Sequence, residues 1–290
     1  MNRESRIEVA EGWHEHAVES WEDPILIVGA TDSGKTTFAR YLYRRLLASV
    51  DRVAFIDLDP GQNAFGLPTT AGMGLGTREG AGFPPEEGRR QLFTCGTSPV
   101  GHEARVLSAL HTLTREARAQ GAGRIVVDTS GFVDVAHGAA ALKWAKVDLL
   151  RPCTVVAFQR GTELHPIIEP WRHCSDVTLI ELPVSDQVRR RSREARRAYR
   201  TRCYRRYFAH ARRIPLHFAD VALYAPGPWA RQQLIALEDA DGYLLALAVI
   251  DAISEAVVWL TTPLSSSDEV AAIRMGDIKL DPTTFEDEHV

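Results

Sequence analysis

Lysine is scarce in this chain of 290 residues, since only four of its 34 basic residues are lysines: Lys35, Lys143, Lys146 and Lys279. Long apolar runs are missing as well. No stretch of 18 apolar residues occurs, and the first six residues, Met-Asn-Arg-Glu-Ser-Arg, lack the apolar core of a signal peptide. These absences argue against a membrane span and against secretion. We therefore expect a cytoplasmic protein with no membrane partner.

Cysteine is infrequent too. The four cysteines, Cys95, Cys153, Cys174 and Cys203, are scattered and form no Cys-x-x-Cys pair. Structural zinc sites and disulfide frameworks both depend on characteristic cysteine spacing. We therefore expect reduced thiols rather than metal ligands.

The net charge of −4 conceals an asymmetry along the chain. Residues 189–213 contain twelve arginines and a single acid, Glu194, so this segment carries +11 while the rest of the chain carries −15. A basic segment on an acidic body predicts one dedicated anion-binding element rather than a protein coated with basic residues.

The segment that organises the chain begins with four apolar residues, 25–28, which predict a short buried strand. The sequence Gly-Ala-Thr-Asp-Ser-Gly-Lys-Thr of residues 29–36 then fits the phosphate-binding loop pattern without a mismatch. Phe38, Leu42 and Leu46 recur at every fourth position and predict a helix directly afterwards. Because strand, glycine loop and helix follow in this order, the chain is predicted to bind a nucleoside triphosphate.

A phosphate needs hydrogen-bond donors that converge on it. The backbone N–H groups of the loop and the positive end of the helix dipole supply them. Lys35 adds a charge at the β- and γ-phosphates, and the Thr36 hydroxyl is placed to ligate Mg²⁺. The residues predicted to bind the nucleotide are Gly29, Thr31, Asp32, Ser33, Gly34, Lys35, Thr36 and Thr37.

A second predicted strand, 52–57, runs into the sequence Asp-Leu-Asp-Pro-Gly-Gln of residues 57–62. Asp59 thus falls at the carboxyl end of a strand, where open parallel sheets collect their ligands. A carboxylate there can join the Mg²⁺ shell or aim an acceptor hydroxyl at the γ-phosphate. Gln62 offers both a donor and an acceptor to a substrate. The alternative interpretation is that Asp59 only caps a turn.

A third strand, 124–128, ends in Asp128, the position of a Walker-B carboxylate that holds Mg²⁺. Residues 128–131, Asp-Thr-Ser-Gly, also match the Asp-x-x-Gly switch of GTPases, but the Asn-Lys-x-Asp sequence expected for guanine does not occur. Phe132 follows directly. It is a candidate for stacking on a nucleobase, and a place in the core is its alternative.

The arginine-rich segment is predicted to be helical, because four residues spaced four apart form one apolar stripe: Ala195, Tyr199, Cys203 and Tyr207. A charge run is usually a solvated face. Beside a phosphate loop, however, it resembles a mobile lid at about 187–213 whose arginines reach a transferring phosphoryl group and a polyanionic substrate.

The rest of the chain alternates strands with helices. The further expected strands are 91–95, 154–158 and 177–182, the expected helices are 102–119 and 137–149, and residues 63–90 are expected to form a long glycine-rich surface loop. Alternation of this kind predicts an α/β fold, a mainly parallel sheet with helices on both faces. We expect this P-loop domain to span residues 1–213, with 1–24 as a short lead-in that docks on the core.

From about residue 214 the pattern changes to strands and turns. Two apolar runs flank the sequence Asp-Ala-Asp-Gly of residues 239–242, which is a hairpin signal. Further strands are expected at 257–260 and 270–280. Residues 214–290 are therefore predicted to form a small β domain with an acidic tail at 286–288.

Four motifs, taken in order, resemble the polynucleotide 5′-hydroxyl kinases of the RNA-processing type. They are the loop at 29–36, the sequence at 57–62, Thr-Ser-Gly-Phe at 129–132, and an arginine helix that ends in Arg-Arg-Tyr-Phe at 205–208. The resemblance covers about residues 13–280 and implies an ATP- and Mg²⁺-dependent phosphotransferase that acts on 5′-hydroxyl ends of RNA or DNA. Phe132 departs from the tryptophan that the family usually has. Only 24 residues precede the first strand, which is typical of the shorter prokaryotic members.

The resemblance also implies residue roles. Asp59 would be the general base, and the two lid arginines would stabilise the transferred phosphoryl group; the expected catalytic residues are Lys35, Asp59, Arg200 and Arg205. The expected substrate-binding residues are Gln62, Thr129, Ser130, Gly131 and Phe132. The expected Mg²⁺ ligands are Thr36, Asp59 and Asp128. Two alternatives stay open: an ATP-bound scaffold of RNA processing without turnover, and a switch-type ATPase or GTPase.

Overall fold

A computed structural model describes residues 13–80 and 82–289 of the chain. These residues form two compact units. The first unit is made of the described parts of Met1–Leu58, Met73–Arg89 and Leu110–Arg190. The second unit is made of Asp59–Gly72, Arg90–Ala109 and the described part of Arg191–Val290. The arginine helix is thus grouped with the C-terminal sheet, and the domain boundary expected after residue 213 stays a prediction.

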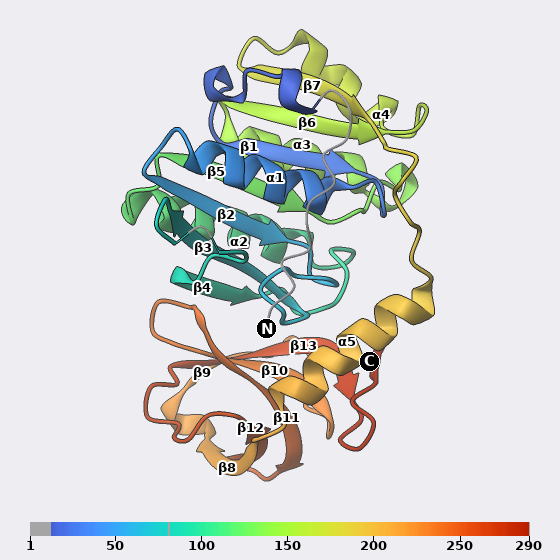
Figure 1. Ribbon diagram of the computed structural model, residues 1–290. Helices are drawn as coiled ribbons and strands as arrows, with labels where there is room; N and C mark the ends of the chain where they lie inside the picture. Colours follow the sequence, from blue (N-terminus) through green and yellow to red (C-terminus); the bar gives the residue numbers. More distant parts are fainter. Residues whose placement is uncertain (1–12, 81, 290) are drawn as a thin grey trace. The chain divides into compact units, whose positions relative to one another are not determined.

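The first sheet has seven strands in the order β4-β3-β2-β5-β1-β6-β7 (Figure 1). The strands are β1 (Ile25–Gly29), β2 (Arg52–Leu58), β3 (Thr70–Thr77), β4 (Glu87–Phe93), β5 (Arg124–Thr129), β6 (Cys153–Gln159) and β7 (Val177–Pro183). The run from β2 through β5, β1 and β6 to β7 is parallel throughout. Central parallel strands are covered on both faces, which explains why β1 is continuously apolar and fully buried.

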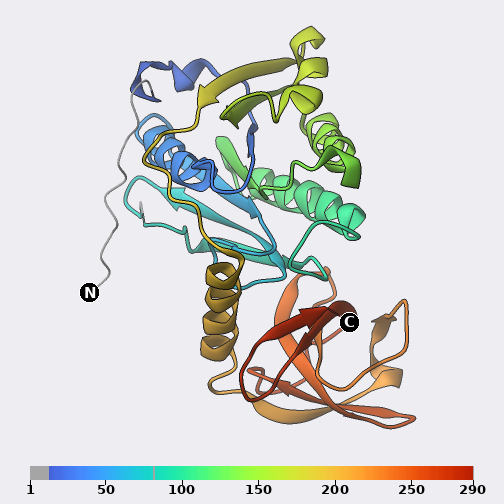
Figure 2. The ribbon, with the colours of Figure 1, turned by 90° about the vertical axis from the view of Figure 1, so that its right-hand side faces the viewer.

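Helices cover both faces of this sheet. They are α1 (Lys35–Leu47), α2 (Glu103–Ala119), α3 (Ala139–Leu150) and α4 (His165–Ile168), with short 3-10 turns η1 (Trp13–Glu15), η2 (Val18–Ser20), η3 (Val135–His137) and η4 (Glu169–His173). Helix α1 lies on one face, and α2 and α3 lie on the other (Figure 2). The predicted α/β class is therefore confirmed. The predicted stripe Phe38, Leu42 and Leu46 is fully buried, as its spacing indicated.

The long surface loop expected at 63–90 is wrong. This stretch contains β3, which is buried along all but its last residue, and the start of β4. Two of the glycines that indicated a loop, Gly72 and Gly76, are required by close packing instead. A Cβ atom at Gly76 would lie 1.7 Å from the Tyr43 hydroxyl, and one at Gly72 would lie 2.7 Å from the Phe65 ring. Glycine in a strand marks such close approaches.

The lead-in is confirmed for the residues that the structure describes. Trp13 and Trp21 are both buried, and the Trp13 ring meets the Phe38 ring edge-on at 5.0 Å between centroids. Residues 1–12, which belong to the same prediction, lie outside the described residues.

Burial raises the pKa of the Cys153 thiol to about 12 and that of the Cys95 thiol to about 11, so both thiols stay protonated at neutral pH.

The second sheet runs β14-β13-β10-β11-β12-β8, and β9 pairs in parallel with β13. Its strands are β8 (Arg212–His217), β9 (Ala222–Tyr224), β10 (Gln233–Glu238), β11 (Leu244–Ile253), β12 (Val257–Thr262), β13 (Ala272–Leu280) and β14 (Asp287–His289), with the 3-10 turn η5 (Phe218–Asp220). The predicted hairpin is present, because β10 and β11 pair antiparallel around the 239–242 turn. The prediction of an acidic tail is wrong, because Asp287 to His289 form a strand that pairs with β13.

Helix α5 (Arg193–Tyr207) packs on this sheet. The helix was predicted correctly, but its buried stripe was not, since Ala195 is exposed while Tyr204 and Phe208 are buried in a cluster with Leu234 and Leu247. The packed face therefore lies one residue further along than the apolar spacing indicated. Among the described residues, no helix has both the length and the apolar character needed to cross a membrane.

Candidate functional site

The loop between β1 and α1 has the shape that phosphate binding requires. A Cβ atom at Gly29 would lie 2.7 Å from Ser33 Oγ and 2.8 Å from Phe158 O, so no larger residue fits. Gly34 has a φ of +89°, and the helix begins directly after it. Phe38 N donates the first helical hydrogen bond to Gly34 O at 3.0 Å. The N–H groups of the first helical turn therefore open at the loop.

Lys35 is held inside this loop. Its side chain is buried, and Nζ donates to Ala30 O at 2.6 Å and to Ser33 Oγ at 3.4 Å. An ammonium group in such a place has left bulk water, so its charge acts strongly on an anion bound at the loop. The expectation that Lys35 supplies charge at the phosphates thus has a matching geometry, and its role stays a prediction.

Thr36 and Asp128 meet directly. The Thr36 hydroxyl donates to Asp128 Oδ2 at 2.5 Å, and Thr129 N donates to Asp128 Oδ1 at 3.0 Å. Mg²⁺ prefers hard oxygen ligands and usually takes one or two carboxylates together with substrate phosphates. The hydroxyl and the carboxylate fit that requirement, so they would hold Mg²⁺, which would neutralise charge on the phosphates. Asp57, buried and paired in register with Asp128, is a carboxylate to which the sequence assigned no role.

Asp59 and Gln62 belong to the second unit and follow the end of β2. Asp59 Oδ1 accepts hydrogen bonds from Gly61 N at 2.9 Å and from Gln62 N at 3.2 Å. The turn-capping interpretation therefore describes part of its geometry, and the two bonds also fix the direction of the carboxylate. Gln62 Oε1 accepts from Arg191 Nη1 at 2.7 Å, which joins a predicted substrate residue to the arginine segment.

Residues 129–132 pack against the phosphate loop. Thr129 Oγ1 donates to Ile27 O on β1 at 2.7 Å, and Thr31 Oγ1 donates to Gly131 O at 3.3 Å. A Cβ atom at Gly131 would lie 2.4 to 2.6 Å from the hydroxyl and backbone of Thr31, so only glycine allows this approach. Phe132, which comes next, is half-buried.

Lys143 is a residue of this region to which the sequence assigned no role. It lies on α3, its side chain is 1% exposed, and Nζ donates to Ser130 O at 3.2 Å and to Thr129 Oγ1 at 3.4 Å. Lys146, one turn further on, is also fully buried. The signal that would have found Lys143 is the scarcity of lysine together with its place in a mostly apolar helix. Arg160 also contacts the phosphate loop, since it donates a hydrogen bond to Asp32 O. Nothing in the sequence indicated this contact.

The start of the expected lid lies close to the phosphate loop, because Val188 Cγ2 is 3.4 Å from where a Cβ at Gly34 would be. The two expected catalytic arginines, in contrast, contact the last described residues of the chain. Arg200 forms a two-pronged ion pair with Asp287, at 2.8 and 3.2 Å, and the Asp287 side chain is 3% exposed. Arg205 Nη2 donates to Thr284 O at 3.1 Å. Their role at a phosphoryl group stays a prediction.

A parallel sheet, a glycine loop that holds a buried lysine, and a threonine–aspartate pair at the helix start define a P-loop nucleotide-binding protein. Residues 29–210 match the family model described as mRNA cleavage and polyadenylation factor CLP1 P-loop. The match covers well over half of the chain, and the chain belongs to this family.

Archaeal proteins are among its relatives. The polyribonucleotide 5′-hydroxyl-kinase of Methanocaldococcus jannaschii is 27% identical over 221 residues, which are 76% of this chain and 59% of the relative. That of Pyrococcus abyssi is 28% identical over 207 residues, which are 70% of this chain and 56% of the relative. The chain thus spans somewhat more than half the length of these relatives. A solved Clp1p–Pcf11p complex shares the fold, with a TM-score of 0.66 at 14% identity over 90% of this chain and 75% of that one.

Proposed function

We propose that this chain is a polynucleotide 5′-hydroxyl kinase that transfers the γ-phosphate of ATP to the 5′-hydroxyl end of RNA or DNA. The observation that carries the proposal is the packing of residues 129–132 on the phosphate loop through Gly131 and Thr31. A nucleotide switch needs no second substrate, whereas a kinase must hold its acceptor beside the phosphates. The names of the archaeal relatives favour RNA over DNA as substrate.

In the proposed reaction, the 5′-oxygen of the acceptor bonds to the γ-phosphorus as the bond from that phosphorus to the β,γ-bridging oxygen breaks. ADP leaves, and the proton of the hydroxyl goes to the Asp59 carboxylate. Lys35 and the loop N–H groups would hold the phosphates, and Thr36 and Asp128 would hold Mg²⁺. Arg200 and Arg205 would stabilise the charge on the transferring phosphoryl group.

The test is the transfer of label from γ-labelled ATP to matched RNA and DNA oligonucleotides with a 5′-hydroxyl. A 5′-phosphorylated oligonucleotide is the substrate control. Lys35→Ala should abolish transfer, and Lys279→Ala, which removes a half-buried lysine from β13, is the matched control that should retain it. If no oligonucleotide of any length or base composition becomes labelled, the proposal is wrong.

A second candidate is an ATP-bound scaffold that binds RNA without turnover. One observation favours it: the Arg200 guanidinium, expected to serve catalysis, is already paired with the buried carboxylate of Asp287. Tight ATP that co-purifies unhydrolysed with a protein inactive in the transfer assay would support the scaffold. Measurable transfer would rule it out.

A further inference from the structure

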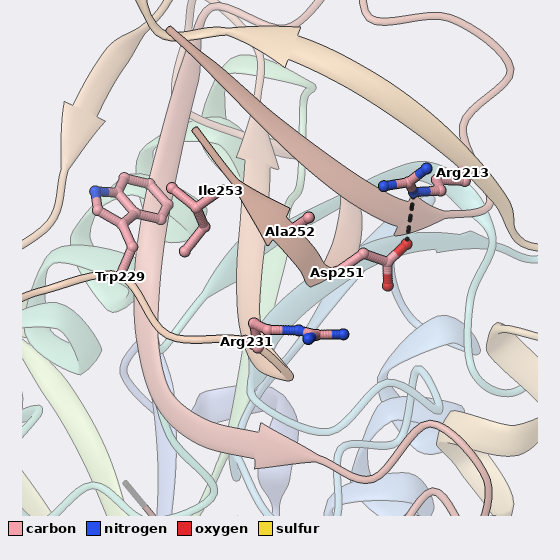
Figure 3. Close-up of a pocket in the computed structure, with 6 residues that line it drawn as sticks. All are labelled: Arg213, Trp229, Arg231, Asp251, Ala252 and Ile253. Carbon is pink, nitrogen blue, oxygen red and sulfur yellow. Dashed lines mark ion pairs between the residues drawn. The ribbon is translucent and has the colours of Figure 1, made fainter. Parts of the chain in front are cut away.

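The arginine-rich segment ends at Arg213 on β8, and this residue lines a pocket of the second unit (Figure 3). The lining residues are Arg213, Trp229, Arg231, Asp251, Ala252 and Ile253. In Figure 3, Trp229 stands beside Ile253 at one end of the pocket, Arg213 and Asp251 face each other at the other end, and Arg231 lies between. The pocket therefore combines an apolar wall with a charged one.

The charged wall is fixed by its neighbours. Arg213 Nε lies 3.5 Å from Asp251 Oδ2, and its guanidinium sits 4.4 Å from the centre of the Trp259 ring. Asp251 also accepts a hydrogen bond from Thr261 Oγ1 at 2.9 Å. The β11–β12 register shifts at this residue, and such a bulge turns a side chain out of the regular alternation.

Arg231 supplies the uncompensated charge of the pocket. Within residues 13–80 and 82–289 it has no ion-pair partner, whereas Arg213 and Asp251 compensate each other. The turn that carries Arg231 is anchored on both sides. Ala230 N donates to the side chain of Gln233 at 3.1 Å, and Gln232 N donates to Ile250 O at 2.7 Å. This anchoring fixes the backbone that carries Arg231, a lining residue of the pocket.

The apolar wall is equally well supported. Trp229 packs on the core of the second sheet, and its ring centroid lies 5.4 Å from that of Phe218. Gln233, which is 3% exposed, donates to Gly276 O at 2.8 Å and so secures the turn beneath Trp229. Ile253, at 39% exposed, is one of the few large apolar side chains that face solvent. A flat apolar group would cover both side chains.

We propose that this pocket binds one ribonucleotide unit of a single-stranded RNA. The base would lie against Trp229 and Ile253, since aromatic side chains bind bases of any sequence by stacking. The 2′-hydroxyl would donate to the Asp251 carboxylate, which is the contact that separates RNA from DNA. The phosphate would meet Arg231, with Arg213 beside it.

This inference rests on the proposed function, because it takes the RNA to be the kinase substrate. Binding itself, however, requires no phosphoryl transfer. The experiment therefore measures the affinity of the full chain for a 5′-phosphorylated single-stranded RNA, by fluorescence anisotropy. Trp229→Ala and Arg231→Ala should each weaken binding roughly tenfold, the order of magnitude of one stacked base. Trp229→Phe should restore most of the affinity. Arg115→Ala, which removes an exposed arginine of α2 outside both the pocket and residues 189–213, is the charge-matched control and should change it little.

A second measurement compares RNA with DNA of the same sequence. Asp251→Asn should lower the ratio of RNA affinity to DNA affinity, because an amide oxygen is a weaker acceptor than a carboxylate. If this variant unfolds, the same ratio measured for Trp229→Ala replaces it, and it should also fall. Competition with a free ribonucleoside monophosphate separates the two sources of this chemistry, and weak competition is expected for a site that reads a strand.

The outcomes are distinct. Equal losses in Arg115→Ala and Arg231→Ala would mean diffuse charge attraction and would overturn the pocket. If the pocket variants lose affinity only for the free ribonucleoside monophosphate and bind RNA unchanged, the proposal is also overturned. If the protein transfers phosphate but none of the pocket variants alters its RNA affinity, the kinase proposal is retained and the pocket proposal is rejected. RNA affinity that depends on Trp229, in a protein without transfer, would retain the site and reject the kinase.

Discussion

Three lysines are buried, although residue spacing gives no indication of this burial. Lys35, Lys143 and Lys146 are at most 6% exposed, although lysine is usually an exposed residue. A buried ammonium is tolerated only where polar partners compensate for its lost hydration. Lys143 meets this condition through Ser130 O and Thr129 Oγ1, so we interpret it as a positioning residue for residues 129–132.

Lys143→Met tests this role. Methionine keeps an unbranched side chain of similar length and removes the ammonium, so Ser130 O and Thr129 Oγ1 each lose a hydrogen-bond donor. We expect the free energy of unfolding to fall by about 1–3 kcal/mol, the cost of leaving a buried acceptor without its donor. KM for the oligonucleotide should rise by more than kcat falls, because the segment loses its anchor. A large loss of stability, with normal kinetics in the folded fraction, would reduce Lys143 to a structural residue.

Asp59→Asn separates the two interpretations of Asp59. Asparagine can still accept the hydrogen bonds from Gly61 N and Gln62 N, so the turn should survive the change. The negative charge and the basicity are lost. We expect kcat to fall by about 10²–10³-fold in the transfer assay, which is typical for loss of one preorganised electrostatic partner. A rate near that of the unmodified protein would leave Asp59 as a turn cap only.

At the scale of elements, the ion pair of Arg200 with Asp287 joins α5 to β14. Arg200→Ala leaves a nearly buried carboxylate uncompensated, and we expect it to lower the free energy of unfolding by about 3 kcal/mol. The double variant with Asp287→Ala should lose less than the sum of the single variants. Chemical denaturation measures both quantities, and Arg202→Ala, an exposed residue of the same helix, is the control.

The same variants bear on the lid. If Arg200 also acts on the phosphoryl group, Arg200→Ala should lower kcat at saturating oligonucleotide below the rate of Asp287→Ala. Arg200→Lys should recover little, because a point charge cannot replace the planar fork of arginine. Equal rates for Arg200→Ala and Asp287→Ala would confine Arg200 to a structural role.

The packing of β3 under α1 gives a second prediction at this scale. Gly76→Ala would place a Cβ atom 1.7 Å from the Tyr43 hydroxyl, and the ring atoms behind it leave no room either. Overpacking of this kind typically costs about 1–3 kcal/mol. Thermal unfolding should therefore occur at a lower temperature than in Gly82→Ala, the control, where a Cβ would meet nothing within 4 Å. Equal stabilities of the two variants would contradict the packing of β3.

At the scale of the whole molecule, charge is concentrated in residues 189–213 on an otherwise acidic chain. Phosphate contacts release counterions, so the affinity for RNA should fall steeply as salt rises. Arg189 and Arg190 are both exposed, whereas Arg191 is bonded to Gln62. Arg189→Gln together with Arg190→Gln should flatten the slope of log affinity against log salt by about 1.4, or 0.7 for each phosphate contact on a single strand. An unchanged slope would mean that these arginines do not meet the phosphates.

Local patterns predicted much of this architecture. The phosphate loop, α1, β5 and the 239–242 hairpin each depend on residues that are close in sequence, so spacing alone was sufficient. The prediction failed for residues 63–90, where Gly76 packs against Tyr43 of α1 rather than facing solvent. It also failed for the buried face of α5, because the sheet selects Tyr204 and Phe208 over the more regular stripe. These failures share one cause: the partner lies far away in the chain.

The sequence by itself determined the class of this protein. A glycine loop between a strand and a helix indicates phosphate binding, and the order Gly34, Lys35, Thr36 identifies it as a P-loop. Only the tertiary structure decided which side chains meet. It brought Thr36 to Asp128, Lys143 to Ser130, and Arg200 to Asp287 across 87 residues of chain. The physical reason is that burial and hydrogen-bond geometry depend on atoms contributed by separate elements, and no local spacing records them.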